Sequence, residues 1–201
     1  MLFILMMVDP YSFGTNSVLK GDGPRILLVV FASTFFLPLI VVLLMKALGF
    51  IPSLELKKAE DRIAPFIATG FFYLSIFYVM YRDPEIPVNF KACFLGAVIG
   101  LFIAFFLNLF SKISLHAIGV GGLLGLVIIT IASSQLSSFV FYSETFGSLE
   151  ISFFSLLVAT ILICGLVGSA RLFLDAHVPK DLYGGFLVGL STQFIALAIL
   201  T

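Results

Sequence analysis

The sequence predicts an all-α, polytopic integral membrane protein, folded as a bundle of six transmembrane helices. Hydrophobic residues make up 61% of the chain and charged residues only 11%, whereas about 25% of an average soluble domain is charged. The mean hydropathy is +1.20. The apolar residues fall into six runs long enough to cross ~30 Å of hydrocarbon, which takes about 20 helical residues. A formal net charge of zero and the lack of a long basic run exclude a nucleic-acid partner.

One membrane domain is expected over residues 1–201, opened by a segment that does not cross the membrane. Residues 1–8 are apolar but too short to span. They lack a basic start, and Asp9 and Pro10 follow where a signal peptide would have small residues, so we expect no cleaved signal. We therefore assign residues 1–25 to an N-terminal interfacial and polar segment.

The lengths of the apolar runs and the charges beside them place the membrane spans. The expected spans are residues 26–46, 63–81, 90–111, 117–137, 150–168 and 182–200. Pro38 is expected to kink the first span, because proline removes one helical hydrogen bond. Cys93 and Cys164 lie inside apolar runs and are interpreted as small buried hydrophobes.

Glycines are concentrated in the fourth and sixth expected spans. They are Gly119, Gly121, Gly122, Gly125, Gly184, Gly185 and Gly189. Small residues at this density let helix backbones approach closely. We interpret most of these glycines as packing positions.

Six spans determine which loops share a side of the membrane. Loops 47–62, 112–116 and 169–181 fall on one side, with both histidines of the protein. The unusual polar residues of this side are Lys57, Lys58, Glu60, Asp61, Arg62, Lys112, Ser114, His116, Arg171, Asp175, His177, Lys180 and Asp181. On the other side, the Ser-rich residues 133–148 look like ordinary solvated linker. Three sequence-distant loops that converge in this way are what an active site requires.

The segment 169–181 carries the most specific pattern in the chain. Arg171, His177 and Asp181 follow the spacing R-x5-H-x3-D. Pro179 favours the first turn of the last helix and an extended residue before it, which places His177 just outside that helix. The Asp181 carboxylate can then accept the Nδ1–H of His177 and leave Nε2 free to attack. The alternative interpretation is a polar cap on two helices.

The other two polar segments also have simple alternatives. The charges of residues 57–65 can serve as a juxtamembrane anchor, and His116 can be an interfacial residue. Considered together, the three segments fit phosphoryl transfer. The candidate ligands for the phosphate oxygens are Arg171, Arg62, Lys58 and Ser114. His177 would attack phosphorus, and a protonated His116 would donate to the leaving group.

These residues resemble the type-2 phosphatidic-acid phosphatase superfamily of integral-membrane lipid phosphate phosphatases. The resemblance runs over residues 57–185: a Lys/Arg/Pro cluster, then Ser114-x-His116, then R-x5-H-x3-D. It implies a metal-independent phosphohistidine mechanism, so no metal or cofactor is expected. The roles it implies are nucleophile for His177, orienting carboxylate for Asp181, general acid for His116, and phosphate ligands for Lys58, Arg62, Ser114 and Arg171.

The chain departs from the family pattern at three points. The first motif, K-x6-R-P, is loose, because two residues separate Arg62 from the proline and neither lysine of residues 57–58 has the family spacing. The second, P-S-G-H, has Leu115 in place of glycine. In the third, one residue separates Ser169 from Arg171. A divergent but active member is expected, and the choice between the two lysines stays open.

The predicted function is hydrolysis of a lipid phosphate or diphosphate: phosphatidic acid, phosphatidylglycerol phosphate or a polyprenyl diphosphate such as undecaprenyl diphosphate. Transfer of the phosphoryl group to an acceptor other than water uses the same site. The alternative is a transporter or an anionic-lipid-binding protein with the same cations, although Asn108 and Gln193 offer little material for a permeation path. Membrane lipids are the other expected partners, and no obligate protein partner is inferred.

Charge counts do not decide the orientation in the membrane. Near the spans, seven Lys and Arg residues lie on the side of the candidate site and four on the other. Without Lys58, Arg62 and Arg171, which the chemistry explains, each side has four, and the positive-inside rule is silent. The resemblance implies a bacterial inner membrane with the site on the periplasmic or outer side and both termini in the cytoplasm.

Overall fold

The computed structural model describes the chain except for residues 1–5, 9–22, 57, 85, 135–136 and 144–146. In the described part, six helical segments are long and apolar enough to cross a membrane, which confirms the predicted helical bundle. The elements in chain order are α2 (Gly23–Phe31), η2 (Ala32–Phe36), α3 (Leu37–Ala47), η3 (Glu60–Arg62), α4 (Ile63–Arg82), α5 (Val88–Asn108), α6 (Leu115–Ser133), β1 (Ser138–Ser143), β2 (Gly147–Ser152), α7 (Phe153–Phe173) and α8 (Pro179–Leu200).

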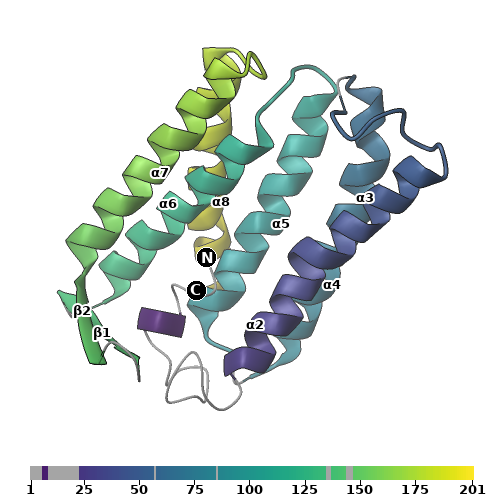
Figure 1. Ribbon diagram of the computed structural model, residues 1–201. Helices are drawn as coiled ribbons and strands as arrows, with labels where there is room; N and C mark the ends of the chain where they lie inside the picture. Colours follow the sequence, from purple (N-terminus) through teal and green to yellow (C-terminus); the bar gives the residue numbers. More distant parts are fainter. Residues whose placement is uncertain (1–5, 9–22, 57, 85, 135–136, 144–146) are drawn as a thin grey trace.

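The helices stand side by side in the order α7, α6, α5, α4 and α3, and α8 packs against α6 and α5 (Figure 1). The loops between α3 and α4, α5 and α6, and α7 and α8 lie at the same end of the bundle, as the span count predicted. One boundary differs in a way that matters. The fifth span runs to Phe173 rather than 168, so Arg171 lies in the last turn of α7 and not in a loop.

The irregularity expected at Pro38 takes the form of a π-helical turn just before it. Over η2 the N–H of Leu37 bonds to the carbonyl of Ala32, five residues back. The Thr34 hydroxyl donates to the Val30 carbonyl at 2.8 Å. A local change of helical period with a hydroxyl bonded to the preceding turn is a usual way to accommodate such a break.

The expected linker at 133–148 is wrong in part, because an antiparallel hairpin occupies much of this region. Strands β1 and β2 pair with Ser138 opposite Ser152 and Val140 opposite Glu150. The ring of Phe139 is buried and lies 5.7 Å from the ring of Phe153 at the start of α7. Serine is the most frequent residue here and suggested a loop, whereas cross-strand pairing and one buried aromatic side chain favour strands.

Glycines bring α6 and α8 into backbone contact. A Cβ atom on Gly189 would lie 2.1 Å from the Ile118 carbonyl oxygen, and one on Gly121 would lie 2.5 Å from that of Phe186. The packing role predicted for the glycines therefore holds at these positions, but not at Gly119 or Gly184, where the space is open. This close crossing fixes the N-terminal ends of α6 and α8 relative to each other.

The N-terminal apolar run contributes to the core. Met6, in the described residues 6–8, is fully buried against a cluster that includes Val30, Ile76 and Phe90. Met6 is thus covered by the bundle, and the interfacial position of residues 1–25 stays a prediction. The rest of that prediction falls largely on residues 1–5 and 9–22, which lie outside the described part.

Candidate functional site

Three sequence-distant segments, together with Leu101 of α5, form a pocket at the loop end of the bundle. Its volume is about 290 Å³. The polar and charged residues that line it are Glu55, Arg62, Thr69, His116, Arg171 and His177. Its apolar lining is Leu54, Leu56, Pro65, Phe66, Leu101, Ile113 and Leu115. Two arginines and two histidines that the sequence predicted to act together thus share one cavity.

The turn between α7 and α8 delivers Arg171 and His177 to this pocket. Helix α7 ends in a Schellman turn, in which the Ala176 N–H bonds to the Arg171 carbonyl at 3.1 Å. Asp175 has the left-handed conformation that this turn requires, with φ +49°. Val178 is extended and Pro179 opens α8, both as predicted. His177 therefore lies between the end of α7 and the start of α8, and its side chain lines the pocket.

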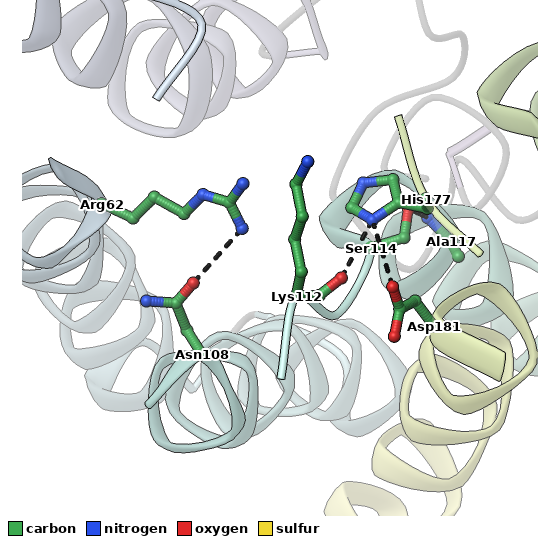
Figure 2. Close-up of polar contacts among 7 residues, drawn as sticks. All are labelled: Arg62, Asn108, Lys112, Ser114, Ala117, His177 and Asp181. Atoms are coloured by element: carbon green, nitrogen blue, oxygen red, sulfur yellow. Dashed lines mark hydrogen bonds and ion pairs between the residues drawn. The ribbon is translucent and has the colours of Figure 1, made fainter. Parts of the chain in front are cut away.

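The imidazole of His177 is held by a backbone carbonyl. Its Nδ1 lies 2.9 Å from the Lys112 carbonyl oxygen and 4.0 Å from the nearer carboxylate oxygen of Asp181 (Figure 2). A carbonyl only accepts hydrogen bonds, so Nδ1 carries the proton and Nε2 of the neutral ring has the lone pair. The predicted tautomer is thus retained, but the hydrogen bond expected to Asp181 is made to Lys112 instead.

The surroundings of His177 favour its neutral form. The side chain is only 6% exposed, and burial lowers the pKa of His177 below its usual value of about 6.5. The positive charges of Arg171 and Lys112 lower this pKa further. The hydrogen bond to the Lys112 carbonyl and the charge of Asp181 raise it, but burial is the largest effect. Nε2 is therefore available as a nucleophile near neutral pH.

Asp181 lies in the first turn of α8 with a side chain that is 9% exposed. At 4.0 Å its carboxylate is beyond hydrogen-bond distance of Nδ1 but close enough to stabilise a positive charge on the ring. Such a charge appears when Nε2 of His177 forms a new bond. The position of Asp181 suits this electrostatic role.

Arg171 carries an unused buried donor. Among the described residues, its Nε is the one buried side-chain nitrogen or oxygen without a hydrogen-bond partner. A buried donor left unpaired costs ~1–3 kcal/mol, and more for a charged group. The arginine lines the same pocket as His177. Arg171 thus keeps one donor that no described protein group satisfies.

Arg62 is anchored by two hydrogen bonds and lies across from His177 in Figure 2. Its Nε donates to the Leu56 carbonyl at 2.8 Å, and its Nη1 donates to Asn108 Oδ1 at 3.3 Å (Figure 2). Asn108 is only 3% exposed, and its Nδ2 donates in turn to the Ala59 carbonyl at 3.0 Å. Three of the five guanidinium N–H groups remain for a ligand. The sequence analysis missed this role of Asn108, although a buried amide at the end of a span was the available signal.

The structure places two predicted phosphate ligands outside the lining of the pocket. Ser114 is fully buried, and its Oγ caps α6 by accepting the Ala117 N–H at 3.3 Å. Lys58 is exposed, and Lys57 lies outside the described residues. The family spacing K-x6-R would put the lysine at position 55, where this chain has the pocket residue Glu55.

Lys112 is a cation that the sequence analysis assigned no role. Its side chain extends between Arg62 and His177 in Figure 2, and its charge acts on the ring of His177. The backbone carbonyl of Lys112 itself also holds the ring of His177. Lys112 thus lies closer to His177 than its place in the 112–116 loop suggested.

Comparison with known proteins identifies no relative, so the assignment of a function depends on the geometry of the site. The chain matches no protein-family model, no curated protein and no solved structure.

Proposed function

We propose that this protein is an integral-membrane phosphatase that hydrolyses a lipid phosphate or diphosphate through a phosphohistidine intermediate. The observation that carries the proposal is a pocket lined by two arginines, Arg62 and Arg171, and by His177, whose Nδ1 is bound to a carbonyl so that Nε2 keeps its lone pair. Cationic donors around a neutral imidazole are the combination that phosphoryl transfer to histidine needs. The proposal agrees with the resemblance to the type-2 phosphatidic-acid phosphatases.

In the first step, the guanidinium groups of Arg62 and Arg171 bind the non-bridging oxygens, and Nε2 of His177 attacks phosphorus. The bond from phosphorus to the leaving oxygen breaks, and His116 donates a proton to that oxygen. The phosphorylated imidazole is now cationic, and the Asp181 carboxylate stabilises it. The hydrogen bond from Nδ1 to the Lys112 carbonyl keeps the ring in place throughout.

In the second step, a water molecule attacks the phosphohistidine. Neutral His116 accepts a proton from this water, the bond between phosphorus and Nε2 breaks, and inorganic phosphate leaves. Both histidines return to their starting protonation states. Another hydroxyl acceptor in place of water would give phosphoryl transfer with the same residues.

The first experiment is phosphate release by detergent-purified protein from phosphatidic acid, phosphatidylglycerol phosphate and undecaprenyl diphosphate. We expect release from at least one, and a loss of at least ~1,000-fold in kcat with His177→Ala, since the nucleophile is removed. His177→Ala should still bind the substrate. A variant that retained more than about a tenth of the activity would exclude His177 as the nucleophile. Binding without release by the wild-type protein would favour the alternative, an anionic-lipid-binding protein or a transporter.

We place the protein in a bacterial inner membrane with the pocket on the periplasmic or outer side. The support is the family resemblance, because the charges that remain after the chemistry is accounted for are equal on the two sides.

A further inference from the structure

Glu55 brings a carboxylate to a pocket whose other charged groups are cations. Among the described residues that line the cavity it is the one acid, and it shares the lining with Arg62 and Arg171. The proposed mechanism uses both guanidinium groups and both imidazoles, but it gives Glu55 no task. Since like charges repel, a carboxylate in this position weakens the binding of a simple phosphate. Its presence therefore points to a ligand that also carries a positive charge.

Hydrogen bonds hold the backbone on both sides of Glu55. Its own N–H donates to the Ser53 hydroxyl oxygen at 3.1 Å. The carbonyl of the next residue, Leu56, accepts the Nε–H of Arg62 at 2.8 Å. Glu55 is thus tied to the arginine that the pocket offers to a phosphate.

Leu56 maintains this arrangement in a conformation that leucine rarely adopts. Its φ is +47°, in the left-handed region that steric contacts of Cβ disfavour for most residues. Strained residues of this kind persist where the surrounding structure fixes them, and they are concentrated at functional sites. Leu54, Glu55 and Leu56 all line the cavity. The fixed turn therefore gives Glu55 a defined place at the pocket.

The pocket has the charge and the space for a zwitterionic phosphate. A phosphate monoester carries about −1.5 to −2 at pH 7 and pairs with Arg62 and Arg171. An ammonium group on the same ligand pairs with Glu55, which is exposed and so can be reached from outside the bundle. The volume of about 290 Å³ equals that of about ten water molecules at ~30 Å³ each. A phosphate group and a two-carbon arm fit in this space together.

We propose that Glu55 is a specificity-determining residue that binds an ammonium group carried on a two-carbon arm beside the phosphate of the substrate. This inference rests on the proposed function for the phosphate site and adds the class of phosphate that the site selects, an ester of a 2-amino alcohol. A lipid headgroup and a free aminoalkyl phosphate share this chemistry.

The test compares two ligands that differ in one group. In 2-aminoethylphosphonate an ammonium group replaces the terminal methyl group of n-propylphosphonate, and the two have the same length. Both are titrated calorimetrically into the detergent-purified full chain and need no turnover. Glu55→Gln keeps the size of the side chain, and Glu55→Lys reverses its charge. Glu60→Gln is the matched control, because Glu60 is exposed in the same loop and does not line the cavity.

We expect the wild-type protein and Glu60→Gln to bind 2-aminoethylphosphonate about 5-fold more tightly than n-propylphosphonate, the factor expected for a partly exposed charge pair. In Glu55→Gln the two affinities should agree within about twofold. Glu55→Lys should prefer n-propylphosphonate, because its ammonium repels that of the other ligand. Equal binding of both ligands by the wild-type protein would overturn the inference, as would a preference that survives Glu55→Gln.

A short-chain lipid distinguishes the two sources of the ammonium. Dihexanoylphosphatidylethanolamine is titrated into the wild-type protein and into Glu55→Gln. Weaker binding of this lipid by Glu55→Gln, together with weaker binding of 2-aminoethylphosphonate, supports a headgroup as the ligand. Weaker binding of the phosphonate alone supports a free aminoalkyl phosphate.

The titrations also separate this inference from the proposed function. If the wild-type protein releases no phosphate from any substrate but has the preference that depends on Glu55, the inference stands and the phosphatase assignment fails. If phosphate release depends on His177 but the preference is absent, the phosphatase assignment stands and the inference fails.

Discussion

At the scale of single residues, the site depends on side chains that backbone groups hold in place. The Lys112 carbonyl fixes the tautomer of His177, and the Leu56 carbonyl and Asn108 fix Arg62. Arg171, in contrast, keeps a buried donor free. The pocket therefore combines two side chains of fixed orientation, His177 and Arg62, with Arg171, whose buried Nε has no protein partner among the described residues.

The amide of Asn108 is a positioning residue for Arg62. With Asn108→Ala, Arg62 loses the Nη1 hydrogen bond and the Ala59 carbonyl loses a donor. We expect kcat/KM for the lipid phosphate to fall by ~10-fold, mostly through KM, because a misplaced guanidinium weakens phosphate binding. Asn89→Ala, at the other end of the same helix, should leave both parameters unchanged. A fall in kcat alone would indicate a different role for Asn108.

The pH dependence of activity tests the environment of His177 through two variants with opposite shifts. The nucleophile must be neutral, so the acidic limb of kcat/KM should rise with pH through a pKa below about 6.5. The general acid must be protonated, and burial and the charge of Arg171 lower the pKa of His116 as well, so kcat/KM should fall again as the pH rises through that pKa. Asp181→Asn removes a charge that raises this pKa, so the acidic limb should move to lower pH. Lys112→Gln removes a charge that lowers it, so the limb should move to higher pH. If the acidic limb moved in the same direction in both variants, a group other than His177, such as His116, would be the one that titrates there.

At the scale of the elements, the crossing of α6 and α8 assembles the site. The glycine contacts bring the start of α6 beside the start of α8, where the Ser114 N–H lies 3.4 Å from the Asp181 carbonyl. The Lys112 carbonyl then reaches His177, 65 residues away in the chain. The close packing of α6 against α8 therefore helps to fix the tautomer of His177.

A side chain on Gly189 should disturb this link. In Gly189→Ala the new Cβ would meet the Ile118 carbonyl oxygen at 2.1 Å and the Gly122 nitrogen at 2.7 Å, so the helices must separate. We expect a loss of about 1–3 kcal/mol in stability, the usual cost of overpacking, with a lower melting temperature in detergent and a reduced kcat. Gly184→Ala, in open space on the same helix, is the control and should keep both values. Equal melting temperatures would show that the crossing adapts without cost.

At the scale of the whole molecule, the polar pocket and the β1–β2 hairpin are separated by the length of the bundle. The loops that form the pocket share one end of the bundle, and the β1–β2 hairpin lies at the other (Figure 1). An apolar groove runs from the pocket along α4 and α5. Under the proposed function, the phosphate would react in the pocket while the apolar part of the lipid would stay beside the helices in the hydrocarbon.

The orientation of this bundle is open to a direct test. In a variant without Cys93 and Cys164, single cysteines at Lys180, beside the pocket, and at Ser148, in the hairpin, are both exposed positions. An impermeant maleimide added to intact cells should label the cysteine at 180 and spare the one at 148. The reverse pattern would place the pocket in the cytoplasm.

The sequence by itself determined the six spans, the shared side of the three polar loops, and the four pocket residues Arg62, His116, Arg171 and His177. These follow from local quantities: the apolar length needed to cross a membrane, the parity of the spans, and residue types at a short spacing. Only the tertiary structure decided that the Lys112 carbonyl, rather than Asp181, holds His177, that Asn108 anchors Arg62, and that Ser114 caps α6. Every residue has a carbonyl, and a serine or an asparagine has several partners within reach, so these choices depend on how closely the helices approach.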